Sequence, residues 1–128
     1  MIGIHSAFAG RPLDVNQRVY KSEAETNQRN QAIAALMHAY EVLEDDPKMV
    51  TDLYTRQCSI NVNARDLAVM GATLANGGKN PVTRRRVIST GNVPHLLAVM
   101  ATAGLYDNSG IWLWKVGLPA KSGVEVAS

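Results

Sequence analysis

A Lys-Ser-Gly triplet, Lys121 to Gly123, follows an apolar stretch near the end of the chain. Such a triplet could line a catalytic site, since the lysine supplies positive charge, the serine a hydroxyl, and the glycine lets the backbone approach a ligand closely. A lysine activates a serine that stands three residues before it. No serine of this sequence stands three residues before a lysine. The triplet therefore resembles one wall of a site whose nucleophile is missing, although a tripeptide alone is a weak signal.

The other reactive side chains do not supply a nucleophile or a metal site. Cys58 is the single cysteine, so an internal disulfide is excluded and a reducing compartment is indicated. Because Cys58 follows an expected helix and precedes apolar residues, we expect a buried, inert thiol. His5, His38 and His95 are too dispersed for a metal motif. We predict no metal and no cofactor.

Composition places the chain among single-domain proteins. Its 128 residues are 46% hydrophobic, enough for one core, and its formal charge is +2. The one basic run, residues 84–86 beside Pro81, has no interleaved aromatic residues and is typical of a solvated loop. There is neither a long apolar run nor a signal-peptide pattern. We therefore expect a cytoplasmic protein without nucleic-acid or membrane partners.

Most of the chain carries helical signals. Residues 1–21 predict an irregular lead-in with room for a short helical turn. A helix then starts either at Ser22, through a capping box with Glu25, or at Thr26, and its apolar stripe continues to Leu43. Asp46 predicts the N-cap of a second helix that begins at Pro47.

Two further helices and a hairpin complete the expected elements. Asn63 predicts the cap of a third helix, which Gly77-Gly78 ends, and a fourth runs from about Asn92 to Ala103. After a turn at 107–110, residues 111–116 and 120–126 predict two strands of an antiparallel hairpin. The expected fold is mainly α with a short C-terminal antiparallel β-hairpin. Because two strands are not stable alone, they must pack on the helices or extend another sheet.

Three long segments resemble the serine-dependent bacterial glutaminases, in the order of that family. They read VYKSEAETNQRNQAIA, LYTRQCSINVNARDLAVMGATLANGGKNPVT and MATAGLYDNSGIWLWKVGLPAKSGV. The resemblance runs from about Arg18 to Val124. It implies hydrolysis of L-glutamine to L-glutamate and ammonia without a metal. It also implies that residues 1–128 are an incomplete glutaminase domain, with a helical region over about 18–106 and the hairpin over 111–126.

The resemblance further implies a fold and a missing part. The family has a serine β-lactamase-like α/β fold, related to the penicillin-binding proteins, of which this chain would form the helical region and part of the sheet. The Ser-x-x-Lys nucleophile of the family lies in an N-terminal half that we expect as the partner of this chain. The sequence alternatives are a catalytically inactive glutamine-binding or protein-interaction module, and a purely structural helical subdomain.

Glu23 and Asn30 match the substrate-binding pair of the family. A carboxylate suits the ammonium group of an amino acid, and an amide suits its carboxylate. If both residues lie on one helix, their spacing puts them about 20° apart around the axis and about 10 Å apart along it, so one glutamine could bridge them. From the residues alone, Glu23 fits a helix-capping charge and Asn30 an ordinary polar helix residue.

Tyr54 and Tyr106 match the two pocket tyrosines of the family. A phenol ordinarily titrates near about 10, so a tyrosine relays protons at neutral pH only beside a cation, which Lys121 would help to supply. We assign the proton relay to Tyr106 and substrate contact to Tyr54. Without the resemblance both would fit core aromatic residues.

The last matched position is Val124, whose backbone N–H would help to form the oxyanion hole. Lys121, Ser122 and Gly123 would support it from the same strand. The apolar surface around Trp112 and Trp114 would be covered by the missing half. We therefore expect this chain to form homo-oligomers on its own.

Overall fold

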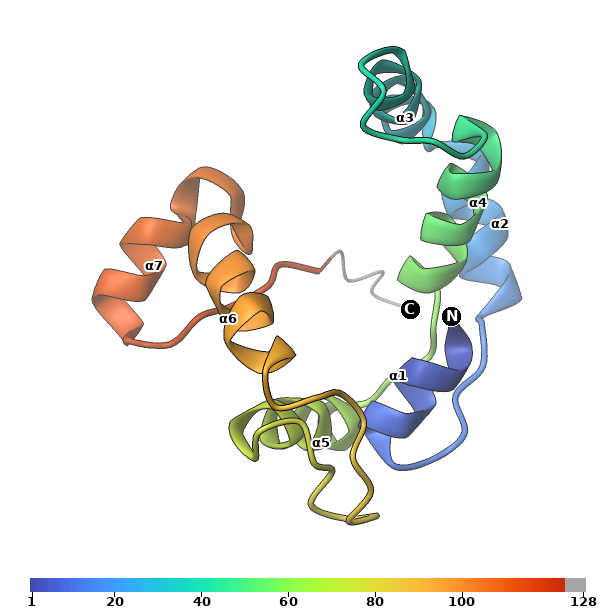
Figure 1. Ribbon diagram of the computed structural model, residues 1–128. Coiled ribbons are helices and arrows are strands. Elements are labelled where there is room, and N and C mark those ends of the chain that lie inside the picture. The colour runs from blue at the N-terminus through green and yellow to red at the C-terminus, as the bar shows by residue number, and fades with distance from the viewer. Residues whose placement is uncertain (124–128) are drawn as a thin grey trace.

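The computed structural model describes residues 1–123, and its regular elements are helices arranged in an open arc (Figure 1). The helices α1 to α4 form one arm, α5 lies at the base, and α6 and α7 form the other arm. The elements in chain order are α1 (Ile2–Ala9), α2 (Gln17–Glu25), α3 (Gln28–Ala39), α4 (Pro47–Cys58), α5 (Ala64–Ala75), α6 (Asn92–Ala103), the 3-10 turn η1 (Tyr106–Asn108) and α7 (Ser109–Val116).

The predicted β-hairpin is wrong. Residues 111–116 lie in α7, residues 120–123 have no regular structure, and residues 1–123 contain no strand. An apolar run of this length suits a strand or a short buried helix equally well, and the residues that flank the run decide between the two structures. Gly117 takes a left-handed conformation with φ 76° and donates its N–H to the carbonyl of Leu113, which is a helix C-cap. The rest of the predicted hairpin, 124–126, lies outside the described residues.

The predicted starts of α4, α5 and α6 are confirmed. The Asp46 carboxylate accepts from the Met49 N–H at 3.1 Å, and α4 begins at Pro47. Asn63 and Asp66 form a reciprocal capping box at the start of α5, each bond 2.9 Å long. The fourth predicted helix coincides with α6. These starts depend on contacts within four residues, so the local sequence contains the information they need.

The N-terminal predictions fail. The lead-in contains all of α1 and the start of α2, which Asn16 caps. Ser22 lies inside α2 and Thr26 is its C-cap, so neither starts a helix. The single predicted helix is divided into α2 and α3, and the Asn27 amide at the break donates to the Thr55 hydroxyl of α4 at 3.0 Å. A tertiary hydrogen bond therefore holds this break.

Two polar side chains join α1 to the base of the arc. Asp66, only 3% exposed, accepts from Arg11 Nε at 2.8 Å and from Arg11 Nη2 at 2.5 Å. This ion pair, with the Asn63 backbone N–H, holds the pKa of the Asp66 carboxyl below its usual value. The fully buried Asn80 donates to the carbonyls of Ala7 and Phe8, at 3.0 and 2.9 Å. The side-chain oxygen of Asn80, Oδ1, accepts from two further backbone N–H groups, those of residues 82 and 83.

The described residues bury little apolar surface. The buried apolar side chains are Ala9, Leu13, Ala34 and Val93. The buried polar ones are Thr51, Thr55, Ser59, Asp66, Thr73, Asn80 and Ser109. The single core that the composition suggested is therefore not formed by residues 1–123 themselves, and large side chains such as Trp114 remain 82% exposed. Within these residues, no helix is long and apolar enough to cross a membrane.

Replacing Asn80 with alanine tests the joint between α1 and the 79–86 loop. The change leaves two backbone N–H groups and two carbonyls without their partner. A buried group left unpaired costs about 1–3 kcal/mol, and these groups belong to residues that water partly reaches, so Asn80→Ala should lower the free energy of unfolding by about 1–3 kcal/mol.

Urea unfolding followed by circular dichroism measures this loss. The matched control is Asn76→Ala, which removes one exposed hydrogen bond, to the Lys79 carbonyl, and should cost less than about 1 kcal/mol. Equal losses in the two variants would show that the buried amide does not hold the joint.

Candidate functional site

Glu23 and Asn30 lie on two successive helices. Glu23 is in the last turn of α2 and Asn30 in the first turn of α3, and both are half-buried. The geometry expected for one continuous helix therefore does not apply. The helix is interrupted between them at Thr26 and Asn27, where the Asn27 bond to Thr55 holds the start of α3 against α4. The break thus brings the pair close to the helix that carries Tyr54.

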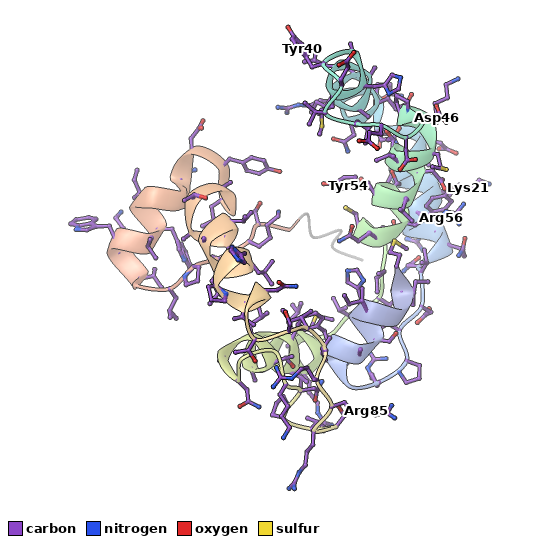
Figure 2. All side chains as sticks on the ribbon, viewed as in Figure 1. Lys21, Tyr40, Asp46, Tyr54, Arg56 and Arg85 are labelled. Carbon is purple, nitrogen blue, oxygen red and sulfur yellow. The ribbon has the colours of Figure 1, made fainter. Side chains whose placement is uncertain are left out.

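Tyr54 extends from α4 toward the inside of the arc (Figure 2). A hydrogen-bonding interaction with the Cys58 thiol, one helical turn away, is the main cause that raises the pKa of the Tyr54 phenol. Negative charge on Cys58 and partial burial raise this pKa further, and charge on Tyr106 and Glu23 adds to the effect. The charges of Glu23 and Tyr106 therefore act on the Tyr54 phenol. No hydrogen bond joins these three side chains within the described residues.

Cys58 is a residue whose role the sequence interpretation missed. Its thiol is exposed, so the prediction of a buried thiol is wrong. The spacing between Tyr54 and Cys58 is four residues inside one helix, which places the two side chains on one face. That spacing was visible in the sequence and could have identified the contact.

Tyr106 and the Lys-Ser-Gly segment meet at the end of α6. Lys121 Nζ lies 5.8 Å from the centre of the Tyr106 ring, within the range of a cation–π interaction. The Ser122 N–H donates to the Gly104 carbonyl at 2.8 Å, and Lys121 Nζ donates to the Ser122 carbonyl at 2.5 Å. Gly123 follows in the same segment, and Val124 lies outside the described residues. The contacts of this segment therefore join Lys121 to Tyr106 and Ser122 to Gly104.

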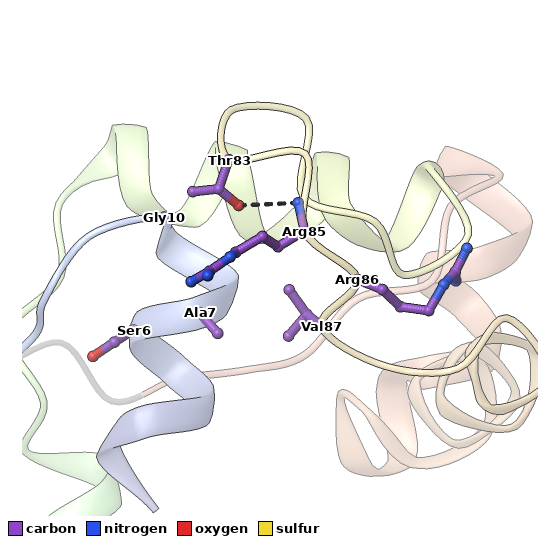
Figure 3. Close-up of a pocket in the computed structure, with 7 residues that line it drawn as sticks. All are labelled: Ser6, Ala7, Gly10, Thr83, Arg85, Arg86 and Val87. Atoms are coloured by element: carbon purple, nitrogen blue, oxygen red, sulfur yellow. Dashed lines mark hydrogen bonds between the residues drawn. The ribbon is translucent and has the colours of Figure 1, made fainter.

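None of these residues lines the two hollows of the described surface. The larger, of about 710 Å³, lies between α1 and residues 83–87 (Figure 3). Its lining comprises Ser6, Ala7, Gly10, Thr83, Arg85, Arg86 and Val87. Arg86 points away from α1, and its guanidinium donates to the carbonyl of Gly77 and the hydroxyl of Thr90. The smaller hollow, of about 310 Å³, is lined by Gln31, Ala35 and residues 46–48.

The candidate site is therefore an exposed face within residues 1–123, with Tyr54 48% and Tyr106 75% exposed. It offers a carboxylate, two phenols and an ammonium group. No group of three or more His, Cys, Asp or Glu side chains suited to a metal ion occurs in this part of the chain. Such a set can hold a zwitterion and move protons, but it has no strong nucleophile apart from the Cys58 thiol.

A glutaminase family model matches residues 1–125 of this chain. The chain belongs to the glutaminase family. It is 60% identical over 117 residues to Glutaminase 2 of Yersinia pestis, covering 91% of this chain and 34% of that protein. It is 52% identical over 124 residues to a glutaminase of Mycobacterium marinum, covering 97% of this chain and 39% of that protein. The chain thus spans between 34% and 39% of the length of these curated relatives.

Solved glutaminase structures contain the same arrangement of helices. A probable glutaminase, YbaS, superposes with a TM-score of 0.92 at 46% identity, over 95% of this chain and 40% of that one. The glutamate form of the protein called Mglu superposes with a TM-score of 0.90 at 41% identity, over 95% of this chain and 28% of that one. The open arc is therefore similar to part of a larger glutaminase structure.

Removing the Cys58 thiol tests the contact with Tyr54. Because the thiol is the main cause that raises the pKa of Tyr54, Cys58→Ala should lower this pKa toward the ordinary tyrosine value. Tyrosinate absorbance, recorded through an alkaline titration and compared with Tyr54→Phe, isolates the Tyr54 transition. The same cysteine replacement made in the Tyr54→Phe background should leave the remaining titration unchanged. A Tyr54 transition that does not move in Cys58→Ala would contradict the contact.

Proposed function

We propose that this chain is part of a glutaminase, which hydrolyses L-glutamine to L-glutamate and ammonia through a serine nucleophile outside this sequence. The observation that carries the proposal is the position of Lys121 beside Tyr106, with Nζ 5.8 Å from the centre of the ring. Family membership supports the reaction, and one solved relative is described in a glutamate form. Because the chain spans little more than a third of its relatives, the activity belongs to the proposal.

The first role in this proposal is recognition of the amino acid. The Glu23 carboxylate binds the ammonium group of glutamine, and the Asn30 amide donates to its carboxylate. Their places on either side of the α2–α3 break let the two side chains approach one substrate from different helices. Tyr54 donates its hydroxyl hydrogen bond to the bound substrate. The free side-chain amide then extends toward the incoming nucleophile.

The second role is acyl transfer. The serine hydroxyl oxygen attacks the side-chain amide carbon, and its proton passes through the Tyr106 phenol toward the leaving nitrogen. The carbon–nitrogen bond breaks, ammonia leaves, and water then attacks the acyl-serine to release glutamate. The Val124 N–H and the N–H of the serine stabilise the oxyanion, each donor contributing about 3 kcal/mol. Lys121 adds positive charge, while Ser122 and Gly123 hold the segment that carries Val124.

Ammonia release from glutamine tests this division of the site. The chain alone should release none above background, because no residue has the Ser-x-x-Lys arrangement. Addition of the N-terminal part of a glutaminase, such as that of the Yersinia pestis relative, should restore turnover. In the restored enzyme Tyr106→Phe should lower kcat by about 100-fold or more, the usual contribution of proton transfer.

The matched control is Tyr40→Phe, since Tyr40 lies at the end of α3 and points away from Tyr54 (Figure 2). That variant should keep the unmodified rate. Turnover by the chain alone would contradict a missing nucleophile. Glutamine binding without turnover in the restored complex would favour an inactive binding module instead.

We also propose that the isolated chain self-associates through α7, where Trp112 and Trp114 are 42% and 82% exposed. A helix that is apolar on all sides is normally covered. Burial of one tryptophan side chain stabilises an interface by on the order of 3 kcal/mol. Trp114→Ala should therefore weaken association by about 10- to 100-fold in sedimentation equilibrium. Lys115→Ala, on the same helix, should change association little, and a chain that remains monomeric at high concentration would contradict this proposal.

A further inference from the structure

We propose that Gly104 is a positioning residue of the candidate site, because its lack of a side chain lets the Lys-Ser-Gly segment lie beside Tyr106. The inference rests on the proposed function, since it assigns a role within that site. Gly104 is the C-cap residue of α6, directly after Ala103, and it is buried. It does not touch the substrate in this proposal. It acts through Tyr106, two residues later, and through Lys121.

Space, and not backbone conformation, requires glycine at this position. The dihedral angles of Gly104 are φ −65° and ψ −26°, which any residue adopts in a helix. A β-carbon built there would run into the backbone oxygens of Ala120 and Met100, and it would lie 2.9 Å from the Ala120 carbonyl carbon. These neighbours are backbone atoms, which cannot rotate away as a side chain does. Any larger residue must therefore move the segment around Ala120.

The same glycine also anchors the segment by a hydrogen bond. Its carbonyl accepts from the Ser122 N–H at 2.8 Å. Lys121 therefore stands between two residues that both lie against Gly104, Ala120 by close packing and Ser122 by this bond. From that position its ammonium group lies 5.8 Å from the centre of the Tyr106 ring. The placement of the cation follows from the contact with Gly104.

A different set of contacts holds Tyr106 in the turn after Gly104. The Tyr106 φ of 52° is in the left-handed region that residues other than glycine rarely adopt. The buried Ser109 hydroxyl stabilises this turn, since it accepts from the Leu105 N–H at 2.9 Å and donates to the Tyr106 carbonyl at 2.7 Å. The corner from Gly104 to Ser109 thus places a phenol and a cation side by side, using one strained residue and one close backbone contact.

Chemical acylation of the lysines reports the position of Lys121 through its reactivity, and it does not require the chain to have enzymatic activity. A limiting amount of an amine-acylating reagent is used, and mass spectrometry compares Lys121 with Lys115 of α7 as the internal reference. In Gly104→Ala the segment loses its place, so the ratio of Lys121 to Lys115 labelling should rise several-fold. Gly110→Ala and Gly71→Ala are the matched controls, because a β-carbon at either position meets nothing within 4 Å, and both should keep the original ratio.

A second variant removes the anchor without adding bulk to the end of α6. Ser122→Pro deletes the N–H that donates to the Gly104 carbonyl and should raise the same labelling ratio. Circular dichroism shows whether each variant keeps its helices. Should Gly104→Ala lose its helices, Ser122→Pro decides the outcome. An unchanged ratio in a folded Gly104→Ala or Ser122→Pro variant would overturn the proposal.

Kinetics of the restored glutaminase distinguish positioning from packing. If Gly104 positions the groups that move the proton, Gly104→Ala should lower kcat by about tenfold or more and change KM much less. Gly110→Ala should leave both values unchanged. An active enzyme whose kcat is insensitive to Gly104→Ala would overturn the positioning role and leave the proposed function standing. If the unmodified complex shows no turnover, the proposed function fails, and the labelling ratio alone then decides whether Gly104 holds the segment.

Discussion

Asn80 and Asp66 join the first helix and the segment after it to the base of the arc across more than fifty residues of sequence, and the position of α1 depends on this joint. Asn80 is fully buried and makes four hydrogen bonds, and Asp66 pairs with Arg11. Such bonds are directional, so they hold α1 in one orientation rather than in a range of similar packings. On α4 the buried Thr51, Thr55 and Ser59 donate to carbonyls one turn earlier. The bonds on α4 lie within that helix, so the contacts that place α1 on the base are those of Asn80 and Asp66.

This distribution of polar and apolar contacts fits a part of a larger structure. Four apolar side chains are buried within residues 1–123, while Trp114, Leu118 and many others are exposed. An independent domain of this length would bury roughly two thirds of the surface of its unfolded chain. The arc nevertheless superposes on a glutaminase more than twice as long, with a TM-score of 0.92. The helices can therefore keep their arrangement while their apolar faces stay exposed. The buried polar contacts help to keep that arrangement.

The correct sequence predictions concern short-range interactions, although not every short-range cap was recognised, since Asn16 at the start of α2 was missed. Helix starts at Asp46 and Asn63 depend on side chains within four residues of the cap, and both are correct. The break near Asn27 depends on Thr55, 28 residues away, and the sequence offers no local sign of it. In the last part of the chain, a strand and a short helix suit residues 111–116 equally well, and the cap at Gly117 decides for the helix. The site residues were named through family resemblance. Their proximity, and the contact of Gly104 with Ala120, required the structure.

The different neighbours of the two tyrosines support the roles proposed for them. The Cys58 thiol, together with partial burial and the charges of Tyr106 and Glu23, raises the pKa of Tyr54 above an ordinary value that already lies well above neutral pH. A protonated phenol donates a hydrogen bond but cannot accept a proton from a nucleophile, which suits substrate contact. Tyr106 has the Lys121 ammonium group 5.8 Å from the centre of its ring. In the proposed division, the binding tyrosine has a thiol beside it on α4, and the relaying tyrosine has a lysine held against the end of α6.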